Sequence, residues 1–188
     1  MFFSFCFGYT LNMFIYIEIL LLLLILIFDH PVLKYLSIVL CFLEARKYQK
    51  NIYPLLLILI ADVFLLTFWH IEIGIFFFCV VQCLYGYLIN HKSHFYVLII
   101  CLVSFEWMIT IYVMLSIINM CKSYKSNHWL FSVLVCLALC DICVALQYLF
   151  HISIPLLWCF YLLSQILYVK KAPNEVGTIV KVNKRSLH

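Results

Sequence analysis

Two aspartates lie in the middle of long apolar runs, where a charged side chain is unfavourable. Asp62 is embedded in LLLILIADVFLL and Asp141 in SVLVCLALCDICVALQYL. An ionised carboxylate at the centre of a bilayer costs about 2.5–3.5 kcal/mol on insertion scales, so acids at this depth usually have a role. Asp62 and Asp141 are therefore the first candidate catalytic residues of the chain.

Three kinds of chemistry fit two buried carboxyl groups. If they lie close together in a low-dielectric site, one holds a proton near neutral pH, which provides one acid and one base. Such a pair suits hydrolysis by an activated water. The same residues suit a proton relay or a cation site in a transporter. They also suit structural hydrogen bonds between helices, with Tyr85, Tyr161 or Gln165 as partners.

The composition predicts an integral membrane protein. Of the 188 residues, 68% are hydrophobic and 11% are charged, and the mean hydropathy is +1.14. A soluble domain carries about 25% charged residues. The net charge of +4 indicates anchoring at the inner membrane face, and we expect no nucleic-acid partner. Most of the ten cysteines lie in apolar runs, where they act as small hydrophobic side chains.

The apolar runs predict one polytopic transmembrane domain over residues 1–169 and a basic cytoplasmic tail over residues 170–188. A spanning helix needs about 20 residues. Runs of that order occur at 9–28, 52–69, 72–90, 128–149 and 152–169, with a shorter run at 31–45. The stretch 94–121 is either one long helix or two short helices that turn near Ser104.

Charge favours two helices in the stretch 94–121. Lys and Arg accumulate in cytoplasmic loops. With two helices, eleven of the twelve basic residues face the cytoplasm, and Lys34 is the exception. We therefore predict an all-α bundle of eight transmembrane helices with both termini cytoplasmic; seven helices is the alternative. Each half of 94–121 would have only about 13 residues, roughly 20 Å. Lys34 either extends to the membrane interface or faces the site.

The two aspartate segments predict an internal repeat of helical hairpins. Asp62 precedes Gln82 by 20 residues, and Asp141 precedes Tyr161 by the same 20. In each unit an acid on the first helix is followed by an amide and a phenol on the second. Repeats of this kind often place a site at the interface between the units.

These motifs resemble those of the YhhN-like lysoplasmalogenase family of small, eight-helix membrane hydrolases. The resemblance covers roughly residues 31–169. It rests on Ala61-Asp62-Val-Phe-Leu65, Gln82-Cys-Leu-Tyr85, Cys140-Asp141-Ile-Cys-Val-Ala145 and Tyr161-Leu-Leu-Ser-Gln165, with Lys34 in the second helix and Tyr112 in the sixth. The chain differs from the family pattern at Ala61, Cys140 and Gln82, where the family has Gly, Ser and His.

The resemblance implies that Asp62 and Asp141 hydrolyse the vinyl ether of a lysoplasmalogen without a metal or organic cofactor. It also implies that Lys34 binds the lipid phosphate and that Tyr85, Tyr161 and Gln165 orient the carboxylates. Gln82 and Tyr112 are further supporting residues. The expected partners are a lysophospholipid substrate and the lipid bilayer. A proton-coupled carrier, an inactive member with a structural or lipid-binding role, and a homodimer remain alternatives.

Overall fold

The computed structural model describes residues 2–68, 70–90, 95–151 and 154–172, and this part of the chain is helical with no β-strand. The helices are α1 (Phe2–Phe28), α2 (Pro31–Lys47), α3 (Tyr53–Val63) with its π-helical continuation η1 (Phe64–Phe68), α4 (Ile71–Asn90), the 3₁₀ turn η2 (Phe95–Val97), α5 (Leu98–Cys101), α6 (Phe105–Ser126), α7 (His128–Phe150) and α8 (Leu156–Lys171). The all-α prediction is confirmed for these residues. The predicted tail beyond residue 172 lies outside them.

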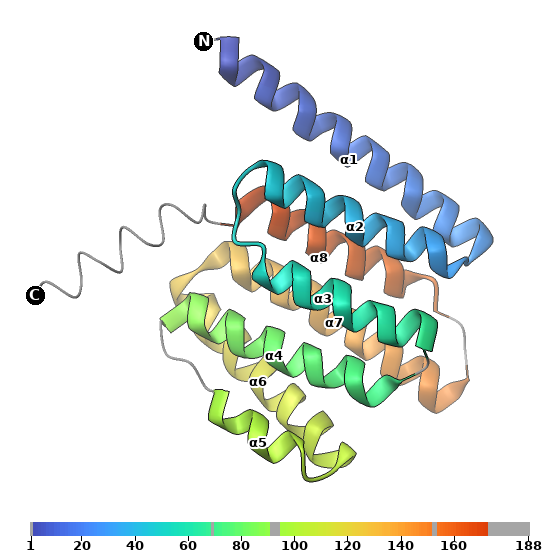
Figure 1. Cartoon of the computed structure of the whole chain (residues 1–188), viewed down its shortest axis with the longest axis vertical. Coiled ribbons are helices and arrows are strands. Elements are labelled where there is room, and N and C mark those ends of the chain that lie inside the picture. The colour runs from blue at the N-terminus through green and yellow to red at the C-terminus, as the bar shows by residue number, and fades with distance from the viewer. Residues whose placement is uncertain (1, 69, 91–94, 152–153, 173–188) are drawn as a thin grey trace, which may run out of the picture.

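Six of the helices form a closed ring in which each helix packs against the next. The contacts run from α2 to α3, α4, α6, α7 and α8, and return from α8 to α2. Helix α1 packs outside this ring on α2 and α8, and α5 packs on α4 and α6 (Figure 1). Side chains from six different helices can therefore meet in the interior of the ring.

The ring helices run in two opposite directions. Figure 1 shows α3 and α7 running one way and α2, α4, α6 and α8 running the other way. The parallel course of α3 and α7 agrees with the prediction for the two aspartate helices. We call the end where α2, α6 and α8 finish the basic end, because it carries Arg46, Lys47, Lys50, Lys122, Lys125, Lys170 and Lys171.

The surface of the bundle has the character expected in a lipid environment. Helices α4 (over Ile71–Ile89), α6 and α7 are each long and apolar enough to cross a membrane. Large apolar side chains such as Ile99 and Leu149 are exposed, by 70% and 68%, whereas Glu18 and Gln82 are buried. Exposed apolar side chains together with buried polar ones are the combination that hydrocarbon favours.

The stretch 94–121 divides near Ser104 as predicted, but into unequal parts. Before the turn, η2 and α5 together rise only about 12 Å. After it, Ser104 caps α6, its Oγ accepting a hydrogen bond of 3.4 Å from the backbone N–H of Trp107. The prediction of two helices of similar length was wrong, because α6 continues through the polar segment 122–126 and ends only at Asn127.

Candidate functional site

Every helix of the ring contributes at least one of the predicted site residues. They are Lys34 on α2, Asp62 on α3, Gln82 and Tyr85 on α4, Tyr112 on α6, Asp141 on α7, and Tyr161 and Gln165 on α8. Asp62, Gln82, Tyr85, Tyr161 and Gln165 are buried, and Asp141 and Tyr112 are half-buried. The ring thus gathers residues that are up to 131 positions apart in the sequence, from Lys34 to Gln165.

Asp62 is paired with Tyr161 deep in the bundle. The Tyr161 hydroxyl donates a hydrogen bond to Asp62 Oδ2. Both side chains are buried, so water does not replace this contact. The bond joins α3 to α8, the two helices that flank α2 in the ring, and it therefore joins the acid of the first predicted repeat to the phenol of the second.

Asp141 is paired with a tyrosine outside the predicted repeat. The Tyr112 hydroxyl donates to Asp141 Oδ2 at 2.8 Å, and Tyr112 is also hydrogen-bonded to the side chain of Gln82. Asn119 Nδ2 in turn donates to Gln82 Oε1 at 3.0 Å and to the Gln82 backbone carbonyl at 2.7 Å. Asn119, Gln82, Tyr112 and Asp141 therefore form one hydrogen-bonded chain across α4, α6 and α7.

Both carboxyl groups are hydrogen-bonded to tyrosines, and Cys140 lies near both pairs. Cys140 interacts electrostatically with Asp62 and with Asp141. It interacts in the same way with Tyr112 and Tyr161. The site is therefore two aspartate–tyrosine pairs that adjoin at one thiol, at the position where the resembling family has a serine.

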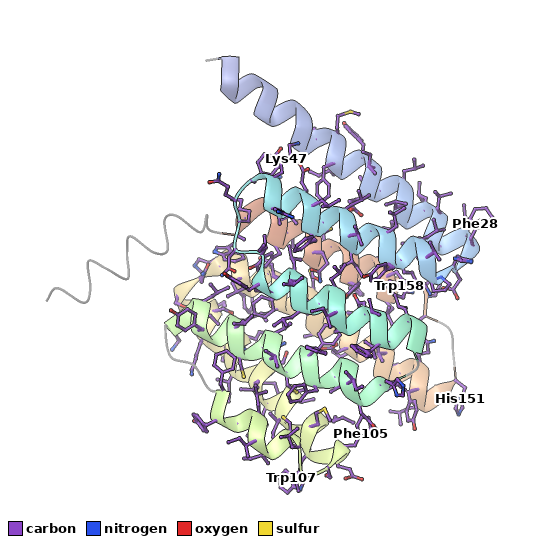
Figure 2. All side chains as sticks on the ribbon, viewed as in Figure 1. Phe28, Lys47, Phe105, Trp107, His151 and Trp158 are labelled. Atoms are coloured by element: carbon purple, nitrogen blue, oxygen red, sulfur yellow. The ribbon has the colours of Figure 1, made fainter. Side chains whose placement is uncertain are left out.

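Lys34 reaches the site through an aromatic side chain. It forms an ion pair with Asp29, and its Nζ lies 4.4 Å from the centroid of the Trp158 ring. Trp158 packs edge-on against Tyr161 at a centroid distance of 5.8 Å. Figure 2 shows Trp158 at the end of the bundle that holds Phe28 and His151, opposite Lys47. The Lys34 side chain, 12% exposed, therefore links the loop after α1 to the partner of Asp62.

Two of the predicted supporting residues lie near the pairs without contacting the carboxylates. Gln165 donates from Nε2 to Ser164 Oγ at 3.2 Å, and its buried Oε1 has no hydrogen-bond partner in the part of the chain that the structure describes. Tyr85 packs against Tyr168 with the ring centroids 6.0 Å apart and interacts electrostatically with Tyr161. The expected orienting role is therefore filled by Tyr161 and Tyr112 in this arrangement.

The backbone after Asp62 widens into a π-helix. The His70 backbone N–H donates to the carbonyl of Phe64 at 3.3 Å, closing the widened segment. Segments of π-helix inside α-helices occur frequently at functional sites. Helix α4 packs tightly here, because a Cβ on Gly74 would lie 2.5 Å from Leu65 Cγ. Gly74 thus allows the close approach of α4 to the segment that follows Asp62.

Sequence reasoning missed Asn119. It lies seven residues after Tyr112, two turns along α6, on a buried face shared with Ser116 and Ser123. That spacing of polar residues within an apolar helix is the signal that could have identified it.

A third buried acid lies outside the ring. Glu18 Oε2 accepts a hydrogen bond of 2.6 Å from Ser37 Oγ, and Glu18 Oε1 accepts one of 3.6 Å from Cys41 Sγ. These bonds attach α1 to α2. Glu18 therefore has a packing role in the α1–α2 interface, apart from the two aspartate–tyrosine pairs.

Among the described residues, no group of three or more His, Cys, Asp or Glu side chains has the arrangement of a metal site. Comparisons with protein-family models, with curated proteins and with solved structures found no match. The resemblance in the motifs therefore stays a prediction.

Proposed function

We propose that this chain is a membrane-embedded hydrolase that cleaves the vinyl-ether bond of lysoplasmalogens, with Asp62 and Asp141 as its acid and base. The observation that carries the proposal is the pair of aspartate–tyrosine contacts that adjoin at Cys140 in the interior of the ring. The motif resemblance supports the same reaction, although the residues Ala61, Cys140 and Gln82 differ from its pattern.

The chemistry needs a proton donor and a carboxylate. Protonation of the β-carbon of a vinyl ether leaves an oxocarbenium ion on the carbon that bears the oxygen. One carboxyl group supplies this proton, and the other stabilises the cation and takes a proton from the attacking water. The hemiacetal then collapses to an aldehyde and a glycerophospho-alcohol. Tyr161 and Tyr112 fix the orientation of the two carboxyl groups throughout.

In this proposal Lys34 binds the phosphate of the substrate. The Lys34 ammonium lies beside Trp158, which packs against Tyr161, so a phosphate held there would be one aromatic ring away from Asp62. The ion pair with Asp29, whose side chain is 76% exposed, would give way to the phosphate. Because the Asp29 carboxylate is exposed to solvent, its release from Lys34 costs little, about 0–1 kcal/mol.

The proposal includes an eight-span topology with both termini cytoplasmic. The basic end then faces the cytoplasm, in agreement with the positive-inside rule. The short α5 segment would cross where α4 and α6 shield it, because it packs against both helices. A reporter fused after Ser104 should then lie on the outer side, and an inner-side result would overturn this topology.

A proton-coupled carrier is the second candidate, and one observation favours it. The hydrogen-bonded chain from Asn119 through Gln82 and Tyr112 to Asp141 runs along α6, whose buried face also carries Ser116 and Ser123 toward the basic end. Chains of polar side chains within a membrane are typical of proton relays. The same aspartates would then bind and release protons during transport.

Hydrolysis of a defined lysoplasmalogen by the purified protein tests the main proposal. The variants Asp62→Asn and Asp141→Asn keep the shape of each side chain but cannot exchange its proton. General acid–base catalysis contributes about 10²- to 10⁴-fold, so each variant should lose at least about 100-fold in kcat. The matched control is Glu18→Gln, an identical change in a buried acid outside the ring, which should retain activity.

The outcomes separate the candidates. Full activity in both aspartate variants would exclude the two-carboxyl mechanism. A parent protein without hydrolytic activity, but with aspartate-dependent solute uptake in proteoliposomes, would favour the carrier. In that case Asn119→Leu should slow proton-coupled uptake, because it interrupts the hydrogen-bonded chain.

A further inference from the structure

A pocket lies between α1 and α2, outside the interior of the ring. The pocket has a volume of about 390 Å³ and is lined by Met13, Phe14, Ile17, Leu40, Leu43, Glu44 and Lys47. Volumes of this order are typical of small-molecule sites. Because α1 packs outside the ring, the pocket is separate from the two aspartate–tyrosine pairs.

The pocket is polar at one end and apolar along its length. Glu44 and Lys47 belong to the last turn of α2, which also contains Arg46 and lies at the basic end of the bundle (Figure 1). Leu40 lies about one turn deeper, facing the α1 side chains. Met13 and Ile17 are 54% and 44% exposed, so the apolar part opens to the surroundings of the bundle. This distribution matches an amphiphile with its head at the basic end and its chain between α1 and α2.

The carboxylate of Glu44 indicates what kind of head group fits. The Glu44 side chain is only 13% exposed, and its Oε2 lies 3.7 Å from Lys47 Nζ. The other oxygen, Oε1, is buried and has no hydrogen-bond partner among the described residues. One oxygen of the Glu44 carboxylate is therefore free to accept a hydrogen bond. A buried carboxylate oxygen without a donor is unfavourable, and a ligand that supplies a donor removes this penalty.

We propose that the α1–α2 pocket binds a phospholipid whose head group carries a primary ammonium, of the phosphatidylethanolamine type. The lipid ammonium donates to Glu44 Oε1, the lipid phosphate pairs with the half-exposed Lys47, and the acyl chain lies along Ile17 and Leu40. A choline head group presents the same phosphate and charge but no N–H donor. The pocket therefore distinguishes two lipids of equal net charge.

Native mass spectrometry of the purified full chain in detergent tests the proposal. The protein is offered an equimolar mixture of phosphatidylethanolamine and phosphatidylcholine with identical acyl chains, so the head group is the only difference. One hydrogen bond to a charged group corresponds to about tenfold in affinity. The ethanolamine adduct should therefore exceed the choline adduct by about tenfold. Equal amounts of the two adducts would overturn the proposal, and this comparison needs no variant.

Variants locate the selectivity. Glu44→Met should bring the ratio of ethanolamine to choline adducts to about one and leave the choline adduct unchanged. Lys47→Met should weaken both adducts, because both lipids carry the phosphate. Lys125→Met is the matched control, since Lys125 is an exposed lysine at the same basic end, and it should change neither adduct. A preference that persists in Glu44→Met would overturn the assignment.

A third lipid separates head-group recognition from simple charge attraction. Phosphatidylglycerol with the same chains is anionic and has no ammonium. It should form weaker adducts than phosphatidylethanolamine, and Glu44→Met should not weaken the phosphatidylglycerol adduct. Stronger binding of phosphatidylglycerol than of phosphatidylethanolamine would show that the basic end attracts anionic lipids in general, and would overturn the proposal.

Discussion

The hydrogen bond between Tyr161 and Asp62 can be tested without any assumption about the reaction. Tyr161→Phe removes one hydroxyl and keeps the aromatic ring that packs against Trp158. It leaves the carboxyl of Asp62 without its donor, and the two residues are only 7% and 6% exposed, so water cannot substitute. An unpaired buried acceptor costs about 1–3 kcal/mol. In a chain of this size each kcal/mol lowers Tm by about 2–4 °C.

We therefore expect Tyr161→Phe to lower Tm by about 4–8 °C, corresponding to about 2 kcal/mol, when thermal unfolding is followed in one detergent. Tyr168→Phe is a matched control on the same helix. Tyr168 is also buried, and its hydroxyl donates to the backbone carbonyl of Asn51 at 2.8 Å. Loss of a bond to this neutral acceptor, on the half-buried Asn51, should cost less.

A double-mutant cycle isolates the contact. In an Asp62→Ala background, removal of the Tyr161 hydroxyl should lower Tm far less than in the parent, because no carboxyl is left unpaired. An equal decrease in both backgrounds would refute the reasoning. A decrease in Tm from Tyr161→Phe that is no larger than the decrease from Tyr168→Phe would also refute it.

Other substitutions test the packing around the site. Gly74→Ala would place a Cβ 2.5 Å from Leu65 Cγ and should lower the free energy of unfolding by an amount typical of overpacking, about 1–3 kcal/mol. An unchanged Tm would show that Leu65 moves aside freely. Glu18→Leu leaves the Ser37 hydroxyl without the acceptor that lies 2.6 Å away, and it should weaken the packing of α1 on α2. The expected result is faster proteolysis in the loop after α1. Glu18→Gln retains an acceptor and should leave the rate of proteolysis unchanged. Asn119→Leu leaves the buried Gln82 amide oxygen unpaired and should lower the free energy of unfolding by about 1–3 kcal/mol. A variant as stable as the parent in thermal unfolding would argue against the chain of hydrogen bonds on α6.

The sequence was sufficient to predict the helical class, because the length of each apolar run and the positions of the charged residues beside it are local features of the chain. A run of apolar residues that is bounded by polar residues defines a helix and its end, and α2, α4 and α7 follow such runs closely. The prediction was less accurate where a helix and its hydrophobic run end at different residues. Helix α6 extends beyond residue 121 because the polar residues there still favour helix, and the π-helical turn after Asp62 has no marker in the local sequence.

The sequence by itself determined which side chains are anomalous in this protein: an acid within an apolar run is visible without a structure. The tertiary structure alone decided their partners. Asp62 contacts Tyr161, 99 residues away, and Asp141 contacts Tyr112 rather than the phenol of its own repeat. These pairings depend on the closure of the ring, because hydrogen bonds are short and directional while the sequence pattern specifies only the face of each helix. The same reason explains why Asn119 and the unpaired Glu44 oxygen became apparent only in the fold.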